Sequence, residues 1–296
     1  MPPDSPVSAR HGIVVGVDGS PASRVAADWA ARDAASRHLP LTLVHVQPPA
    51  DARMWIDVPI PAGGRKRGES CAREVLADAA QLAAAAATDL TVDVLSLAGN
   101  PVAALAELSD SATMVVVGRR GLGAVGRRLL GSVSSGVMRH AHCPVAIVHD
   151  EDPLMANPAS APVVVGVDGS PVSELATGIA FEEAARRGVA LVALHAWSDF
   201  GVYGIAEADW SDLRLLAEDE LGRRLEAWTQ RYPQVAVRRV VTHERPSRAL
   251  VREAESAQLL VVGSRGRGGF AGLLLGSVSA AVAESARMPV IVARTA

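Results

Sequence analysis

The chain has 296 residues, of which 49% are hydrophobic and 21% charged, and its formal net charge is −3. This composition is typical of globular proteins, and the length favours two domains because single cores rarely exceed roughly 250–300 residues. The slight negative charge excludes a general nucleic-acid binder, which needs a basic surface. No uncharged run is long enough to predict a membrane span or a secretion signal, and two cysteines without CxxC spacing indicate the reducing cytoplasm.

Strands and helices are expected to alternate along the first half of the chain. Short β-branched or apolar runs predict strands, and stretches with a helical period of apolar residues predict helices. Ser20 and Pro21 form a typical helix start, with a capping hydroxyl followed by proline at the first helical position. The expected strands cover 13–17, 41–46, 91–97, 114–117 and 145–148, and the expected helices begin at 21 and cover 67–87, 101–109 and 132–140.

The same order returns in the second half. IVVGVDGSP at 13–21 is repeated as VVVGVDGSP at 163–171, and the glycine-rich stretch 114–137 is repeated at 259–282. The segment between the copies, 150–162, contains three prolines and is typical of a linker. We therefore expect two homologous domains, 1–150 and 162–296. In the second, strands are expected at 163–167, 190–196, 235–241, 259–262 and 290–293, and helices at 172–187, 210–231, 246–255 and 277–286.

Continuous apolar strands alternating with amphipathic helices predict parallel sheets that are buried on both faces. The fold class is thus α/β, with two tandem doubly wound domains, each an open five-stranded parallel sheet with helices on both faces. Ligands of such sheets bind beyond the carboxyl ends of the strands, where the strand order reverses.

One aspartate follows the first strand of each half at such a strand end, Asp18 and Asp168. A carboxylate there could accept hydrogen bonds from a ribose or an amide. An Asp before Gly is also typical of an Asx turn that leads into a helix, and turn statistics favour this structural interpretation.

A glycine loop follows the fourth strand of each half with the same spacing, Gly-x2-Gly-x9-Gly-Ser. Its glycines let the backbone approach an anion or adopt a positive φ, and its serine opens a helix whose free N–H groups favour phosphate. Arginines 119, 120, 127 and 128 in the first loop add positive charge, although each alone is more typical of a solvated face. A Walker A loop is excluded, because the only lysine, Lys66, lies between two arginines.

Several histidines lie near these strand ends. His45 and His195 are expected to be packed, hydrogen-bonded residues rather than catalytic ones. His140, His142, Cys143 and His149 could be drawn as a metal cluster, but the second half offers no equivalent ligands, which argues against one.

The GVDGS strand end and the Gly-x2-Gly-x9-Gly-Ser loop, found in both halves, resemble the universal stress protein family, of its tandem two-domain kind and ATP-binding branch. The resemblance implies one ATP site per domain. Asp18 and Asp168 would contact the adenosine part, and backbone at Val46, Ala196, Val117 and Val262 would bracket the adenine. Ribose and phosphates would be held by Gly118, Gly121, Gly131, Ser132 and Ser134, and by Gly263, Gly266, Gly276, Ser277 and Ser279.

Family members often carry a divalent ion such as Mg²⁺ with the nucleotide and pair through their last strands. In a tandem chain the two halves can form that pair internally. A homodimer of whole chains is a second possible assembly. The expected function is an ATP-binding stress-response regulator with little or no hydrolysis, and so no enzyme, which acts through an unidentified protein partner. The alternative is a slow ATPase or a phosphoryl- or adenylyl-transfer enzyme, for which no general base or lysine clamp is evident. Flavin binding is a third interpretation, weakened by the scarcity of aromatic residues near the loops.

Overall fold

The computed structural model describes residues 11–47, 62–121, 130–149, 158–197, 207–267 and 274–294. The chain divides near residue 150 into two compact units, 1–150 with the last two residues and 151–294. Each unit is a domain that contains five of the strands.

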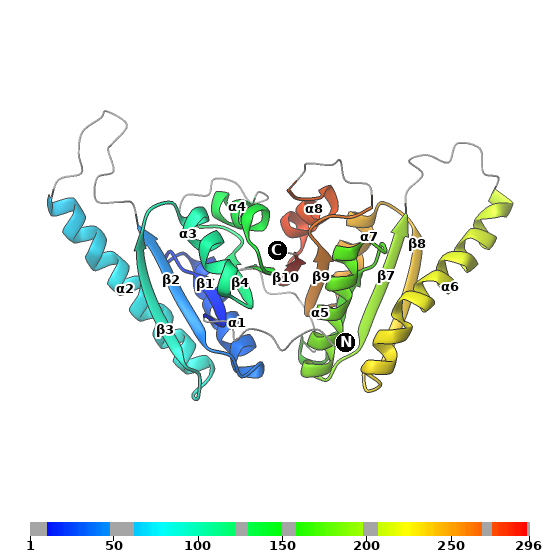
Figure 1. Ribbon diagram of the computed structural model, residues 1–296, viewed down its shortest axis with the longest axis horizontal. Coiled ribbons are helices and arrows are strands. Elements are labelled where there is room, and N and C mark those ends of the chain that lie inside the picture. The colour runs from blue at the N-terminus through cyan, green and yellow to red at the C-terminus, as the bar shows by residue number, and fades with distance from the viewer. Residues whose placement is uncertain are drawn as a thin grey trace, which may run out of the picture. The chain divides into compact units, whose positions relative to one another are not determined.

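The first domain contains five strands and four α-helices among its described residues (Figure 1). In chain order they are β1 (Ile13–Gly16), α1 (Pro21–Ser36), β2 (Leu41–Gln47), α2 (Ala62–Ala86), β3 (Val92–Ala98), α3 (Pro101–Leu108), β4 (Met114–Gly118), α4 (Ser132–His140) and β5 (Val145–Val148), with a 3-10 turn at Ser109–Ser111.

The second domain repeats this order after a 3-10 turn at Pro158–Ser160. Its elements are β6 (Val163–Gly166), α5 (Pro171–Arg187), β7 (Leu191–Trp197), α6 (Glu207–Arg231), β8 (Val237–His243), α7 (Pro246–Ala254), β9 (Leu259–Gly263), α8 (Ser277–Ser285) and β10 (Val290–Ala293).

Each domain forms a five-stranded sheet whose neighbouring strands are all parallel. The strand order is β3-β2-β1-β4-β5 in the first domain and β8-β7-β6-β9-β10 in the second. The order reverses between β1 and β4, where Val15 is paired with Leu43 on one side and Val116 on the other. The site expected at this reversal therefore has a defined place in the fold.

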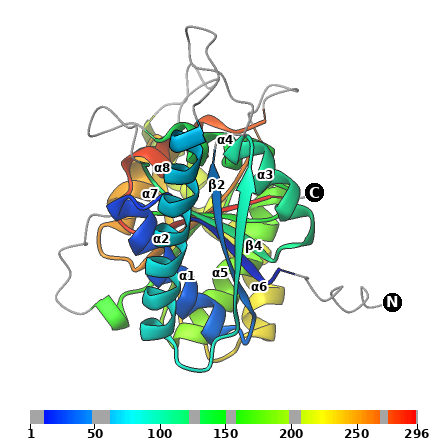
Figure 2. The same cartoon turned by 90° about the vertical axis from the view of Figure 1, so that its left-hand side faces the viewer.

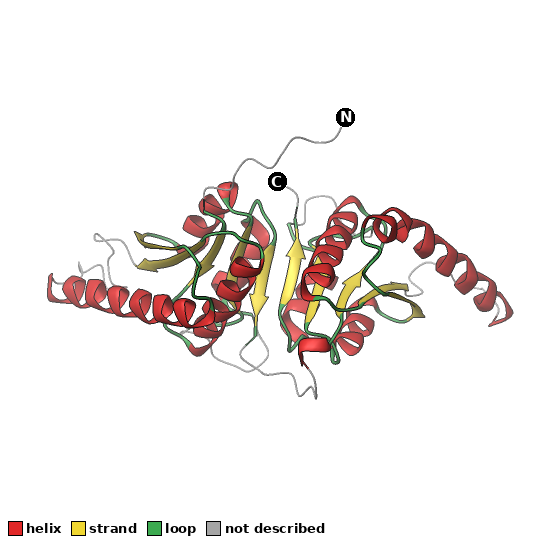
Figure 3. Ribbon diagram, turned by 90° about the horizontal axis from the view of Figure 1, so that it is seen from below, coloured by secondary structure: helices red, strands yellow, loops and turns green. Residues whose placement is uncertain are grey.

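Helices cover both faces of each sheet. Figure 2 shows α1 and α2 on one face of the first domain and α3 and α4 on the other, and Figure 3 shows helices on both faces of the second. The central strands are completely buried: Ile13, Val14 and Val15 have no exposed surface, nor have Val163, Val164 and Val165. The predicted fold class is confirmed.

Helix starts follow the capping signals in the sequence. Ser20 Oγ accepts a hydrogen bond from the N–H of Ser23 (3.2 Å), and Ser170 does the same for Ser173 (3.2 Å). Each serine thereby satisfies one of the N–H groups that the first turn of a helix leaves open. No helix in the described part of the chain is long and apolar enough to cross a membrane.

Three elements differ from the prediction by two residues or more. The helix expected at 67–87 begins at residue 62, the helix expected at 210–231 begins at residue 207, and the strand expected at 235–241 lies at Val237–His243. The strand begins later because the N–H of Val235 closes a turn onto the carbonyl of Tyr232 (3.0 Å), so pairing with β7 starts only at Val237.

Candidate functional site

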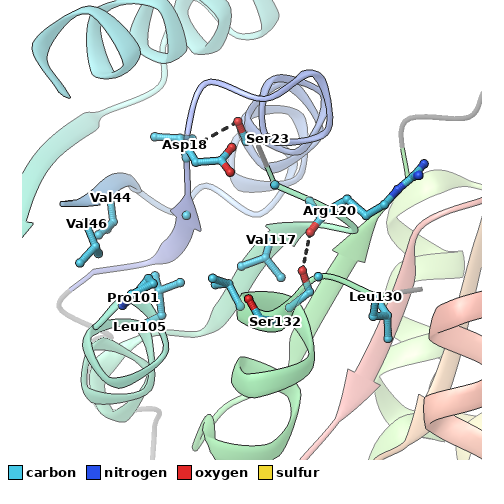
Figure 4. Close-up of a pocket in the computed structure, with 17 residues that line it drawn as sticks. Asp18, Ser23, Val44, Val46, Pro101, Leu105, Val117, Arg120, Leu130 and Ser132 are labelled. Carbon is cyan, nitrogen blue, oxygen red and sulfur yellow. Dashed lines mark hydrogen bonds between the residues drawn. The ribbon is translucent and has the colours of Figure 1, made fainter. Parts of the chain in front are cut away.

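A cavity of about 560 Å³ opens at the carboxyl ends of β1 and β4 in the first domain (Figure 4). Its volume falls within the range of roughly 300–1,000 Å³ that is usual for small-molecule sites. All the residues predicted for the first site line it, and they come from the ends of β1, β2 and β4, the loop after β4 and the start of α4. These residues are Asp18, Val46, Val117, Gly118, Gly121, Gly131, Ser132 and Ser134.

One end of this cavity is apolar. Val44 and Val46 reach it from β2, Val117 from β4, and Pro101 and Leu105 from α3 (Figure 4). Such a slot can accept a flat, largely apolar ring between aliphatic side chains.

Sequence reasoning missed the two α3 residues. The side-chain oxygen of Asn100 caps α3 through the N–H of Val102 (2.8 Å), and Pro101 is the first residue of the helix. This Asn-Pro helix start follows the end of β3, so the sequence could have predicted that α3 begins at the carboxyl edge of the sheet, next to the site. Leu105 is buried and packs against Gly16 at the end of β1, a contact that depends on strand order rather than local sequence.

The aspartate after the first strand forms the turn that general statistics favoured. Asp18 Oδ1 accepts a hydrogen bond from the N–H of Ser20 (3.0 Å), and Gly19 between them has φ +82°. Asp168 makes the same bond to Ser170 (2.9 Å) around Gly169, at φ +77°. The Asx turn is thus confirmed in both copies, and it leaves the second carboxylate oxygen to face elsewhere.

The first glycine of the loop gives room for the neighbouring helix. A Cβ on Gly118 would lie 2.7 Å from the carbonyl of Ala22 in α1, and one on Gly263 would lie 3.2 Å from the N–H nitrogen of Ser173 in α5. α1 therefore approaches Gly118 more closely than a side chain would allow, and α5 leaves only a tight fit for a Cβ at Gly263.

The last glycine of the loop is needed for a close approach and not for a positive φ. Gly131 has φ −63° and Gly276 has φ −77°, so the alternative of a positive φ at these positions is wrong. A Cβ would lie 3.3 Å from the Arg119 carbonyl oxygen at Gly131 and 3.3 Å from the Ser264 carbonyl oxygen at Gly276. The loop folds back on its own first residues, which leaves little space.

The start of α4 presents N–H groups to the polar end of the cavity. Gly131 caps the helix without a side-chain hydrogen bond, and Ser132, the first helical residue, is exposed. Uncapped N–H groups and the helix dipole favour an anion there. Arg120 also lines the cavity, whereas Arg127 and Arg128 lie outside the described residues.

The second serine of the loop is buried and holds the loop in place. Ser134 Oγ donates to the Gly118 carbonyl (2.7 Å), and Ser279 Oγ donates to the Ser264 carbonyl (2.9 Å). The expectation that Ser134 and Ser279 also contact phosphates stays a prediction.

The second domain places its predicted residues in the same local arrangement. Asp168 lies in the turn after β6, Ala196 near the end of β7, and Val262 and Gly263 at the end of β9. Gly266 lies against the Asp168 carboxylate, Gly276 caps α8, and Ser277 is exposed at its first position.

The histidines at the ends of the second strands are packed as expected. His45 Nδ1 donates to the Val17 carbonyl and His195 Nδ1 to the Val167 carbonyl, both at 2.7 Å, so the expected hydrogen bonds of these rings are confirmed. Among the described residues, His, Cys, Asp and Glu side chains form no group of three or more that could hold a metal ion.

The chain is similar to known proteins over nearly its whole length. The family model described as "Universal stress protein family" matches residues 10–149 and again 160–294. The chain is 52% identical over 286 residues to "Universal stress protein Rv2623" of Mycobacterium tuberculosis, covering 96% of each chain. It is 52% identical over 288 residues to "Universal stress protein Rv2005c" of the same species, covering 96% of this chain and 97% of the other. A crystal structure of a universal stress protein from Archaeoglobus fulgidus shares the fold, with a TM-score of 0.70 at 24% identity, over 96% of this chain and 98% of that one.

Proposed function

The chain belongs to the universal stress protein family, and on that premise we propose that each of its two domains binds ATP and that the protein works as an ATP-dependent regulator. The observation that carries the proposal is the cavity in the first domain, which joins an apolar slot to the open N-terminus of a helix.

The two ends of the cavity suit the two ends of a nucleotide. An adenine ring fits between the aliphatic side chains of Val46, Leu105 and Val117, where its faces lose water contact. The phosphates would lie against the N–H groups at the start of α4, beside Gly131 and Ser132, which favour negative charge. Asp18 also lines the cavity, just after the end of β1, and the ribose is proposed to lie beside it.

Little or no hydrolysis is proposed, because the groups that would activate a water are scarce. Among the described residues that line the cavity, Asp18 is the only carboxylate and Arg120 the only cation. Asp18 already accepts a hydrogen bond from Ser20 and is poorly placed to act as a general base. Mg²⁺ that accompanies the nucleotide would be held mainly through phosphate oxygens, with Asp18 as the only carboxylate among the described lining residues.

Regulation then depends on whether ATP is bound, with occupancy read by a protein partner. The competing proposal is an enzyme that hydrolyses ATP slowly or transfers its phosphoryl or adenylyl group. The two differ in what leaves the protein: a regulator releases ATP unchanged, and an enzyme releases ADP, AMP or a modified acceptor.

The test is the nucleotide released from freshly purified, denatured protein, identified by mass spectrometry and quantified against the chain. We expect intact ATP at close to two molecules per chain, because both domains have the same turn and loop geometry. A ratio that saturates near one would restrict binding to one domain. Turnover on the order of 1–1,000 per second, the usual enzymatic range, would overturn the regulator and favour the enzyme.

A further inference from the structure

The residues that line the first-domain cavity are almost completely repeated in the second domain. Each of them has a counterpart of the same type at the matching place of the repeat, with two exceptions. Both exceptions lie on the second strand, where Val44 and Val46 (Figure 4) correspond to Leu194 and Ala196. Among these lining positions, the two domains therefore differ in the apolar slot and not at its polar end.

The surroundings of the two exceptions are the same in both domains. A Cβ on Gly16 would lie 3.0 Å from Leu105, and a Cβ on Gly166 would lie 3.2 Å from Leu250. Both leucines are buried, and the second strand of each domain pairs with this glycine in the same register. The change of side chain on the second strand is thus set in an otherwise matching wall.

At the end of the second strand, the second domain has shorter and more polar side chains. Val46 pairs with Leu97 of β3, whereas Ala196 pairs with Thr242 of β8, and all four residues are half-buried. Paired residues of neighbouring parallel strands point to the same face of the sheet. The second domain therefore lacks the two methyl groups of Val46 and has a hydroxyl beside that place.

The longer side chain of Leu194 does not replace the methyl groups that Ala196 lacks. Alternate residues of a parallel strand lie about 6.6 Å apart, and one extra carbon–carbon bond adds only about 1.5 Å. Leu194 is also buried within the sheet, as Val44 is in the first domain. Less apolar surface is thus available to a flat ring at the strand end of the second domain.

We propose that the two domains hold ATP unequally, and that Ala196 makes the second site about 4- to 15-fold weaker than the first. This range corresponds to the loss of one to two buried CH₂ groups from the contact with the base. The inference rests on the proposed ATP binding. It assigns the change in occupancy with ATP concentration to the second domain, while the first domain stays filled over a wider range.

The first test follows each site separately in the unaltered full-length chain, after the copurified nucleotide has been removed. Leu105 and Leu250 lie beside the two slots, so their methyl NMR signals report on one domain each. We expect the Leu250 signals to reach half of their change at an ATP concentration about 4- to 15-fold higher than the Leu105 signals. Equal midpoints, or a lower midpoint for Leu250, would overturn the inequality and leave ATP binding standing.

Exchange of the strand-end residue between the domains tests the cause of the inequality. Ala196→Val should bring the Leu250 midpoint to within about twofold of the Leu105 midpoint. Val46→Ala should raise the Leu105 midpoint by about 4- to 15-fold. Val94→Ala is the matched control and should move neither midpoint, because Val94 is 48% exposed and lies on the opposite face of β3 from Leu97. Midpoints that stay unchanged in both exchange variants would overturn the role of residue 196.

Adenosine and inorganic triphosphate locate the difference along the nucleotide. The inequality should persist with adenosine, which carries the base, and should be absent with triphosphate, because the lining residues of the polar end are the same in both domains. A difference that survives with triphosphate, or one that is absent with adenosine, would overturn its origin at the base. A chain in which neither leucine responds to ATP or adenosine would overturn the proposed function and this inference with it.

Discussion

The two domains pack their long helices in different ways. In the first domain α1 and α2 pack together with small side chains, and Ala27, Ala31, Ala79 and Ala83 are all buried. In the second domain aromatic rings lie between α5 and α6: Phe181 stacks on Trp228 and Tyr232, with ring centroids 6.0 and 5.8 Å apart. Gly178 leaves room for the Trp228 ring, which lies 2.6 Å from where a Cβ would be.

The carboxyl edges of the two sheets, by contrast, are nearly the same. The N-cap hydrogen bonds of α1 and α5 both have Oγ–N distances of 3.2 Å. The bonds from His45 and His195 to backbone carbonyls both have Nδ1–O distances of 2.7 Å. Hydrogen bonds between loops tolerate little change in distance or angle. A helix layer can be rebuilt with other apolar side chains if the total volume is kept. The duplicated chain thus kept its loop geometry while its helix packing diverged.

The largest expected effect comes from giving the second domain the first domain's small residue. Phe181→Ala, which introduces the counterpart of Ala31, should lower the unfolding free energy of the second domain by about 3–5 kcal/mol, because Phe181 is completely buried. Hydrogen exchange of β6 and β9 should accelerate while that of β1 and β4 stays unchanged. Equal acceleration in both domains would mean that the rings do not act locally. The reverse change, Ala31→Phe, should overpack the first domain and lower its unfolding free energy by about 1–3 kcal/mol.

A smaller effect on stability is expected at the shared loop. Gly131→Val with Gly276→Val should cost about 1–3 kcal/mol through crowding, since a Cβ at either position already lies 3.3 Å from a loop atom. The protein should stay folded, with an unchanged far-UV spectrum, and should lose the copurifying ATP. Outright unfolding would show that these glycines serve the fold alone. Stoichiometric ATP in the double variant would place the phosphates elsewhere.

The helix caps should respond equally in the two domains. Ser20→Ala and Ser170→Ala each remove one N-cap bond, which should cost about 1 kcal/mol, and Ser20→Ala also removes the longer bond from the hydroxyl to the Arg120 carbonyl (3.3 Å). Denaturant unfolding of the two single variants measures this. A difference well above about 0.5 kcal/mol between them would contradict the equivalence of the two carboxyl edges.

The smallest expected effect is a pH dependence of the second domain. Burial raises the pKa of Tyr232, and the nearby charge of Glu182 raises it further. The unfolded tyrosine therefore loses its proton at lower pH than the folded one. The contribution of Tyr232 to the unfolding free energy is fully present below about pH 10, the ordinary pKa of tyrosine, and is lost as the pH rises above it. Tyr232→Phe should remove this fall, which denaturant unfolding at about pH 8 and pH 10.5 would detect.

Helix and strand positions were predictable wherever the apolar pattern was strong. The strands at 145–148 and 290–293 have the predicted bounds because they are short, continuous apolar runs. The early start of α2 was not predictable, because the stretch 63–68 contains three glycines, which favour helix poorly. A helix formed farther along can extend through such a stretch, since each added residue gains one hydrogen bond.

The repeat, the alternation of strand and helix and the two loops were visible in the amino-acid sequence because they depend on local residue types and on spacing. The place of the site followed from them, since parallel strands bring their carboxyl ends to one edge. The inclusion of Leu105 in the cavity, the use of the Ser134 hydroxyl within the loop and the contact of Asp168 with Arg267 depended on folding. Leu105 and the Asp168–Arg267 bond join segments far apart in the chain, which only the order of the strands brings together. The Ser134 bond spans one loop and depends on how that loop folds back on the end of β4.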